Sequence, residues 1–194
     1  MMRAFIAIKL SDGIVAAISD AQRTLASANS DTKLVAPQNI HITLKFLGNI
    51  DEATGVGSPQ DLERLANLIA PATASFKTFN IEAYGMGSFP ERGSPRVIWV
   101  GCRGDVAALK AIATLVEQYS KRVGIPEEDR EFASHITIGR VKSNKNIAGL
   151  REKLATFSQT SFGSQAVAGF TLFKSDLRSE GPVYTALREF RLGT

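Results

Sequence analysis

Apolar residues follow two spacings along this chain, and the spacing changes from one segment to the next. Short runs rich in Val, Ile, Phe and Thr are typical of strands, whereas apolar residues three and four positions apart predict helices. Serine, proline and glycine mark the boundaries. In the first half this pattern predicts a strand over 3–10, a helix over 12–28, a strand over 41–48 that stops at Gly48, a helix over 58–70 and a strand over 76–84.

The second half follows a Gly/Pro-rich segment, 85–95, and repeats the order of strand and helix. The pattern predicts a strand over 96–102, a helix from Asp105 to Gly124, a charged loop over 126–131, a strand over 135–141, a short helix over 147–157, and strands over 165–173 and 183–192. Strands alternate with helices, but the closing pair of strands resembles a hairpin. We therefore expect an α+β fold with a mixed sheet rather than a doubly wound one.

Composition narrows the class of protein. With 194 residues and 44% hydrophobic content, the chain can bury a real core, and we expect one domain over 1–194. The net charge of +4 favours anionic partners but lacks the dense basic blocks of obligate nucleic-acid binders. The single cysteine, Cys102, is expected to be a buried thiol in a reducing compartment. No signal peptide or membrane span is evident, so we expect a soluble cytoplasmic protein. Nothing in the sequence requires an oligomer, so we expect a monomer.

The sequence contains only two histidines, and both begin nearly the same four residues. HITL starts at His41 and HITI starts at His135, each within a predicted strand. Neighbouring side chains in a strand point to opposite faces, so each His shares a face with the Thr two positions later, while the Ile points into the core. An ancient duplication with a pseudo-twofold relation would place both strands side by side and bring two imidazoles and two hydroxyls into one cleft.

Two histidines in one cleft suit acid and base catalysis on a phosphodiester. An imidazole has an unperturbed pKa near 6.5, so one copy can be neutral while the other is protonated. The neutral ring would deprotonate an attacking water, and the charged ring would protonate the departing ribose oxygen. Thr43 and Thr137 would donate hydrogen bonds to the non-bridging phosphate oxygens. This scheme requires no metal or other cofactor.

Three alternative interpretations of these residues were considered. A histidine on a strand is commonly structural, and threonine is simply a good strand former. A metal site is the second alternative, but neither histidine has a nearby second ligand at a spacing such as H-x-x-x-H. The third is a serine nucleophile, for which the G-x-S-x-G pattern is missing. Because the two motifs use every histidine in the chain, we favour the catalytic interpretation.

With these motifs, the chain resembles the two-histidine (2H) phosphoesterase superfamily, which is defined by two H-x-[ST]-x motifs. More closely, it resembles the RNA 2',3'-cyclic phosphodiesterase branch, also called 2'-5' RNA ligase or LigT-like. The likeness covers nearly the whole chain, through RAFIAIKL, PQNIHITLKFLGNI, FPERGSPRVIWVG, HITIGR and LFKSDLRSEGPVYTALREF. The resemblance implies a bilobal α+β fold with two pseudo-symmetric sheet-plus-helix lobes around a central cleft.

The resemblance also implies an activity and roles for individual residues. It implies hydrolysis of RNA 2',3'-cyclic phosphate ends to 2'-phosphates, with His41 as the proton donor and His135 as the proton acceptor. Arg140 occupies the place of a substrate-binding arginine in the family. Strand parity directs it to the face opposite His135, so that a bend at Gly139 would be needed. Phe46 holds the matching place in the first motif and could stack on a base, although a core position is the more common state.

Some features leave the substrate open. Phe89 in the Gly/Pro-rich segment is ambiguous in the same way as Phe46. The family commonly has Pro before the second histidine, whereas this chain has Ser134, and an insertion-like segment at 51–60 lengthens the loop after the first motif. The same residues fit reversible 2'-5' RNA ligation, hydrolysis of small cyclic nucleotides, or a catalytically weak RNA- or nucleotide-binding module. Intact His and Thr in both motifs favour the enzyme.

Overall fold

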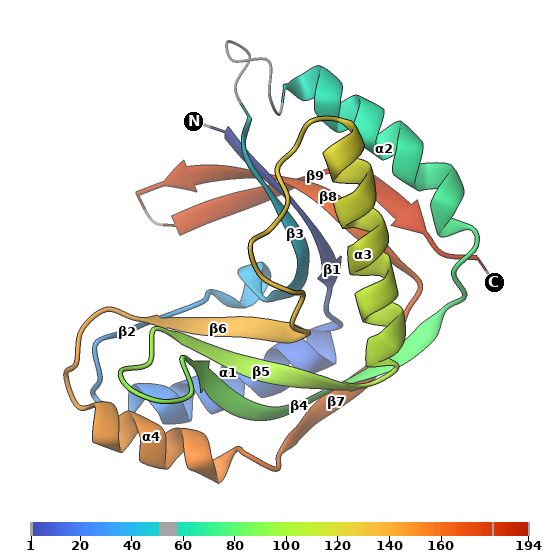
Figure 1. The fold of residues 1–194 in the computed structure, drawn as a ribbon. Coiled ribbons are helices and arrows are strands. Elements are labelled where there is room, and N and C mark those ends of the chain that lie inside the picture. Colours follow the sequence, from blue (N-terminus) through green and yellow to red (C-terminus); the bar gives the residue numbers. More distant parts are fainter. Residues whose placement is uncertain (1, 51–57, 180, 194) are drawn as a thin grey trace.

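The computed structural model describes residues 2–50, 58–179 and 181–193 (Figure 1). Its strands form a nine-stranded sheet with the order β7-β4-β5-β6-β3-β1-β8-β9, in which β2 pairs with β6 and every named pair is antiparallel. The strands are Met2–Lys9 (β1), Thr32–Leu34 (β2), His41–Ile50 (β3), Phe79–Phe89 (β4), Val97–Gly104 (β5), His135–Val141 (β6), Ser161–Val167 (β7), Gly169–Arg178 (β8) and Gly181–Arg191 (β9).

The sheet has two halves that meet at β3 and β6. One half contains β1, β3, β8 and β9, and the other contains β2 and β4 to β7. The register joins the two halves through Ile42 of β3 and Ile136 of β6, after which β6 continues along β2. The halves diverge from this junction, so the fold is α+β and bilobal, as the resemblance implied (Figure 1).

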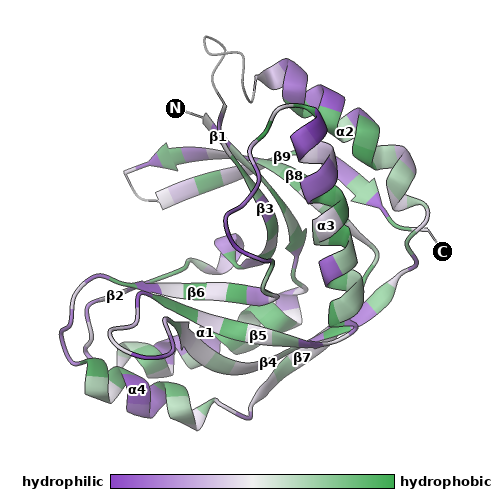
Figure 2. Ribbon diagram, viewed as in Figure 1, coloured by the Kyte–Doolittle hydropathy of each residue, from purple (hydrophilic) through white to green (hydrophobic). Residues whose placement is uncertain are grey.

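Two of the helices, α1 and α3, each cross from one half to the other. Helix α1 (Asp12–Ala26) follows β1 but packs against β7, and α3 (Val106–Arg122) follows β5 but packs against β3. The other two helices, α2 (Pro59–Thr73) and α4 (Ile147–Thr156), contact α3 and α1 respectively. This crossing buries apolar residues of both halves in one continuous core, seen as green positions along β1 and β3 in Figure 2.

Local sequence signals explain where several elements begin and end. Helix α2 starts as predicted because the Ser58 side chain accepts the Asp61 backbone N–H, while the Asp61 carboxylate accepts the Ser58 backbone N–H. Pro59 occupies the first helical position, where its missing N–H leaves no hydrogen bond unmade. Gly124, just after α3, has a φ of +83°, a conformation that favours glycine and ends the helix.

The predicted boundaries were wrong at three strands. The first-motif strand continues past Gly48 to Ile50, because Gly48 adopts a φ of +82° within it. The strand over 76–84 begins later and extends through half of the Gly/Pro-rich segment to Phe89. The predicted strand over 165–173 is two strands, β7 and β8, separated at Ala168, and only β8 and β9 form the expected hairpin.

Two other expectations involve short segments. Strand β2 was not predicted, since three residues give too little alternation to detect. Most of the insertion-like segment, residues 51–57, lies outside the described residues. Among the helices described, none is both long enough and apolar enough to cross a membrane.

Candidate active site

The two H-x-T motifs meet at the junction of the halves. Ile42 pairs with Ile136 in an antiparallel register, which sets position 41 beside 137 and position 43 beside 135. Both isoleucines are fully buried in the core. The two histidines and two threonines are half-buried on the opposite face, as the alternation predicts. One small area of sheet thus holds two imidazoles and two hydroxyls, each His opposite the Thr of the other motif.

The backbone holds both imidazoles in the same way. Nδ1 of His41 lies 2.8 Å from the Asn39 carbonyl oxygen, and Nδ1 of His135 lies 2.7 Å from the Ala133 carbonyl oxygen. A carbonyl oxygen only accepts hydrogen bonds, so each Nδ1 carries its proton and donates it. The Nε2 atom of each ring is therefore the one that can take up or release a proton. Nε2 of His41 also lies 3.0 Å from the Thr43 hydroxyl oxygen.

The two rings have different surroundings. The His41 ring packs against Phe5 at 5.0 Å and edge-on to Tyr184 at 5.5 Å between ring centroids. This burial lowers the pKa of His41, and the hydrogen bond to Asn39 opposes part of the effect. The His135 ring lies edge-on to Phe89, with centroids 5.3 Å apart. Phe89, ambiguous in the sequence, therefore forms part of the wall beside the second histidine.

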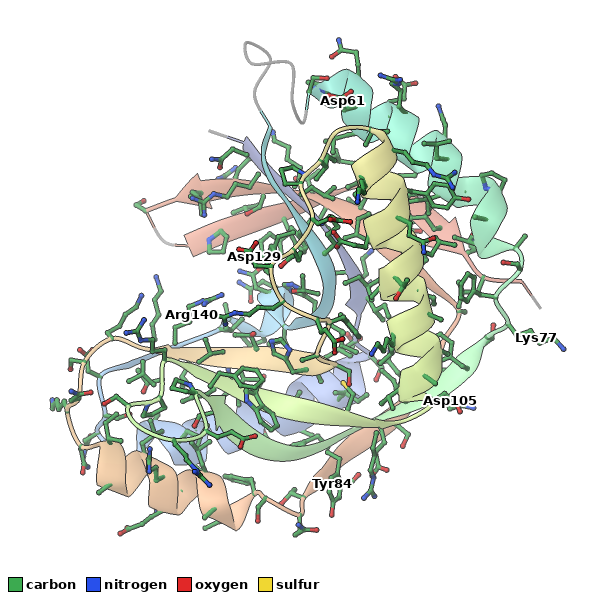
Figure 3. All side chains as sticks on the ribbon, in the orientation of Figure 1. Asp61, Lys77, Tyr84, Asp105, Asp129 and Arg140 are labelled. Carbon is green, nitrogen blue, oxygen red and sulfur yellow. The ribbon has the colours of Figure 1, made fainter. Side chains whose placement is uncertain are left out.

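A β-bulge in β6 determines the position of Arg140. Thr137 lies opposite Trp99 and Gly139 lies opposite Ile98, so Ile138 is an extra residue on β6. The extra residue reverses the alternation and sets Arg140, opposite Val97, on the same face as His135. In Figure 3 Arg140 lies between β6 and the strands of the other half. Simple strand parity was therefore wrong for Arg140, and the bend that it required is this bulge.

Gly139 contributes space to this bulge rather than an unusual backbone angle. Its φ lies outside the left-handed region that favours glycine. A Cβ atom at this position would lie 3.2 Å from Cγ2 of Thr32 and 3.4 Å from Cδ2 of Leu34, both on β2. The lack of a side chain therefore allows β2 to pair closely with the end of β6.

Strand β3 has a bulge at the matching place. Thr43 lies opposite Ala7 and Lys45 lies opposite Ile6, so Leu44 is the extra residue. Phe46 follows on the same face as His41, opposite Phe5, and its side chain is 56% exposed. The more common core position is therefore wrong for Phe46. Both motifs thus bring the fifth residue after the histidine onto the cleft face.

The residue before Phe46, Lys45, points the other way and is fully buried. Its Nζ atom lies 2.8 Å from Oε1 of Glu117 on α3 and 2.9 Å from the Pro126 carbonyl oxygen. Glu128 in the loop after α3 accepts the Phe46 backbone N–H at 3.1 Å. These contacts fasten the bulge of β3 to the charged loop that leads into β6. A lysine between the apolar residues Leu44 and Phe46 was the available sequence signal for this network.

A pocket of about 480 Å³ is lined in part by Phe5 and Tyr184, the two rings that contact His41. Its walls come from β1, β3, β6, β8 and β9, and they combine aromatic rings with polar and cationic groups. Its lining includes Arg3, Phe5, Phe46, Asn49, Arg140 and Tyr184. We refer to it below as the outer pocket. Sequence reasoning found Phe46 and Arg140 but missed Tyr184, because nothing local shows that β9 lies next to the first motif.

Within residues 2–50, 58–179 and 181–193, His, Cys, Asp and Glu side chains form no group of three or more that could hold a metal ion. The candidate site brings together two imidazoles, two hydroxyls, an arginine and surrounding aromatic rings. These groups can exchange protons and hold an anion at one place.

Comparison with known proteins agrees with this geometry. A protein of Methanothermobacter thermautotrophicus named RNA 2',3'-cyclic phosphodiesterase is 33% identical over 191 residues, covering 98% of this chain and 99% of its own. A protein of the same name from Archaeoglobus fulgidus is 36% identical over 190 residues, covering 97% and 99% of the two chains.

Solved structures agree as well. E. coli LigT in apo form aligns with a TM-score of 0.76 and 25% identity, covering 100% of this chain and 98% of that chain. E. coli LigT complexed with 3'-AMP aligns with a TM-score of 0.74 and 25% identity, covering 100% and 98%. The family described as LigT like phosphoesterase matches residues 8–99 and 104–184. This match spans most of the chain, which therefore belongs to the LigT-like phosphoesterase family.

Proposed function

We propose that the chain hydrolyses the 2',3'-cyclic phosphodiester ends of RNA to 2'-phosphomonoesters. The observation that carries this proposal is the shared arrangement of the two motifs, in which both Nδ1 atoms are bound to backbone carbonyls and both Nε2 atoms remain for proton exchange. The relatives named RNA 2',3'-cyclic phosphodiesterase, which match this chain over nearly its full length, support the same activity.

In the proposed reaction, the neutral Nε2 of His135 removes a proton from water as the water oxygen attacks phosphorus. The bond between phosphorus and the 3' oxygen breaks, and Nε2 of His41 gives its proton to that oxygen. The product carries a 2'-phosphate and a free 3' hydroxyl. At the end of the reaction His135 is protonated and His41 is neutral. Proton exchange with solvent then restores the starting state of both rings. The assignment of His41 as donor follows the family resemblance.

The lowered pKa of His41 has a consequence for this assignment. Burial favours the neutral ring in the free protein, whereas a proton donor must be charged. A bound cyclic phosphate carries a negative charge next to the ring and stabilises the imidazolium. We therefore propose that His41 acquires its proton together with the substrate.

The remaining site residues hold the phosphate in this scheme. The hydroxyls of Thr43 and Thr137 donate hydrogen bonds to the two non-bridging oxygens, whose charge grows as water attacks. The Arg140 guanidinium adds a positive charge on the same face as His135. A ribose hydroxyl could replace water as the nucleophile, so the same groups would support 2'-5' ligation by reversing the direction of proton transfer.

The proposal includes the oligomeric state and the cellular compartment of the enzyme. We propose that the enzyme acts as a monomer, since the two motifs of one chain meet in the sheet and supply both histidines. Cys102 is the single cysteine, and burial raises the pKa of its thiol to about 12, so the thiol stays protonated and unreactive. The Cys102 side chain is half-buried rather than fully buried as the sequence suggested, and a chain with this single thiol fits a reducing compartment such as the cytoplasm.

The test is incubation of the purified protein with EDTA and a short RNA that ends in a 2',3'-cyclic phosphate, with the product identified by 31P NMR. Formation of a 2'-phosphate supports both the metal-independent mechanism and departure of the 3' oxygen. A 3'-phosphate would contradict the direction of cleavage. If the folded protein binds the RNA without turning it over, the activity is wrong and the chain is a binding module.

A further inference from the structure

The outer pocket continues the line of the catalytic groups along β1 and β3. On the cleft face of β1, Ala7 lies opposite Thr43, Phe5 lies opposite Phe46, and Arg3 lies opposite Asn49. A path along the two strands from the phosphate-binding threonine therefore meets an aromatic pair and then a polar, cationic pair. Arg3 is four residues from Ala7, so their Cα atoms are about 13 Å apart at roughly 3.3 Å per residue.

The middle of this path has the character of a base-binding site. Phe46 is 56% exposed, and its ring centroid lies 6.3 Å from that of Phe5. The Tyr184 ring lies edge-on to Phe5 at 4.7 Å and completes an aromatic wall. Exposed aromatic faces bind nucleobases by stacking, and the pocket volume of about 480 Å³ lies in the usual range for small-molecule sites.

The far end of the path is suited to a second anion. Nε of Arg3 donates a hydrogen bond to Oδ1 of Asn49 at 3.2 Å, which fixes the plane of the guanidinium and leaves its terminal nitrogens for another acceptor. The ion pairs found among the described residues do not include Arg3. The nearest acidic neighbour on β8, Asp176, is paired with Lys174 at 3.1 Å.

We propose that the outer pocket is a nucleotide subsite: it holds the nucleoside of the cyclic end, and Arg3 binds the phosphate on the 5' side of that nucleoside. This inference rests on the proposed function and makes it more specific. Arg3 contacts a group that an RNA chain has and a free cyclic nucleoside lacks. The enzyme therefore selects cyclic ends that carry a phosphate on the 5' side, as the end of an RNA chain does, over cyclic nucleosides with a free 5' hydroxyl.

The test compares kcat/KM for three substrates: adenosine 2',3'-cyclic phosphate with a free 5' hydroxyl, the same compound with a 5' phosphate, and the dinucleotide ApA with a 2',3'-cyclic end. The wild-type protein is expected to prefer the two compounds that carry a phosphate on the 5' side by about tenfold, as for a charge-assisted hydrogen bond. Arg3→Gln is expected to reduce this preference to near one. The slope of log KM against log salt for ApA should also become shallower by about 0.7, as for loss of one contact to a single-stranded phosphate.

Arg23→Gln is the matched control. Arg23 lies on α1, is exposed and is paired with Asp20, and it should leave the preference at the wild-type value. Equal preference in wild type and Arg3→Gln, or no preference in wild type, would overturn the subsite while leaving the proposed function in place. No turnover of any of the three substrates by wild type would overturn the proposed function and this inference with it.

Discussion

The strands β3 and β6 carry the same motif and differ in the residues that follow it. Both present His and Thr on one face, bind the Nδ1 of the histidine to a carbonyl two residues earlier, and form a bulge at the third residue after it. The fourth residue is Lys45 in β3 and Gly139 in β6, and the fifth is Phe46 or Arg140. The comparison teaches that the repeated part positions the histidines and threonines proposed to react, whereas the residues after each bulge differ between the two strands.

The specialised residues give the two halves different roles. Lys45 anchors β3 to α3 and to the loop before β6, and Gly139 allows β2 to pair with β6. Of the fifth residues, Phe46 offers an aromatic surface on one side of the cleft and Arg140 offers a positive charge on the other. A substrate with a base and a phosphate matches this pair of surfaces.

The largest effect on kcat is expected for the two histidines, which both halves share. Replacing either His41 or His135 by Ala should lower kcat by roughly 10²- to 10⁴-fold, because each removes one partner of an acid and base pair. The double variant should be little worse than either single variant, since the two act together. Steady-state kinetics measures this effect, and circular dichroism with thermal unfolding verifies that each variant is folded. Retained activity in a folded single variant would refute the acid and base assignment.

Thr43 and Thr137 are also equivalent in the two motifs, and replacing either is expected to lower kcat less than replacing a histidine. Thr43→Val and Thr137→Val keep the shape and strand preference of the side chain but remove the hydroxyl. Each should lower kcat by roughly 10- to 1,000-fold through loss of a hydrogen bond to developing charge. If both variants react at the wild-type rate, the threonines are only strand residues.

The ion pair between Lys45 on β3 and Glu117 on α3 is expected to affect the stability of the fold. Glu117→Leu removes the carboxylate from Lys45, whose charge is completely buried, and should lower the free energy of unfolding by about 3 kcal/mol. Lys45→Met should cost less, because Glu117 is partly exposed and can be solvated. Urea unfolding measures both, with Glu127→Leu as a control at an exposed pair. A larger loss for Lys45→Met than for Glu117→Leu would contradict this account.

Substitutions of Arg140 and Phe46 should affect KM differently as the salt concentration changes. Arg140→Met should raise KM by about tenfold and reduce its dependence on salt, because it removes a charge that binds phosphate. Phe46→Leu should raise KM by a similar factor at every salt concentration, because stacking involves no counterion release. KM measured at several ionic strengths separates the two. Equal salt slopes in both variants would show that the two surfaces do not differ as proposed.

The smallest effect concerns the pH dependence of stability. Burial lowers the pKa of His41 in the folded protein, so the unfolded chain binds more protons between that lowered pKa and about 6.5. The free energy of unfolding should therefore fall as the pH is lowered through this window. His41→Gln should lose this contribution, and chemical unfolding at about pH 8 and about pH 5 measures the difference. A wild-type protein with the same pH dependence as His41→Gln would exclude a buried, neutral His41.

The sequence alone predicted most of the local elements and the residues that we propose to react. Alternation in HITL and HITI placed each His with its Thr, and both isoleucines are buried as predicted. Capping residues located the start of α2, because a cap depends on hydrogen bonds within a few residues. The two-histidine motifs also identified the family, since they bring together every histidine in the chain.

Only the tertiary structure decided which residues surround those groups. The bulges at Leu44 and Ile138 result from the register between paired strands, which local periodicity cannot reveal, and they determine on which side Phe46 and Arg140 lie. The contact of Tyr184 with His41 depends on where β9 enters the sheet. The buried charge of Lys45 is tolerated because α3 crosses from the other half to meet it. Long-range packing set these positions, and a strand pattern contains no information about its neighbours.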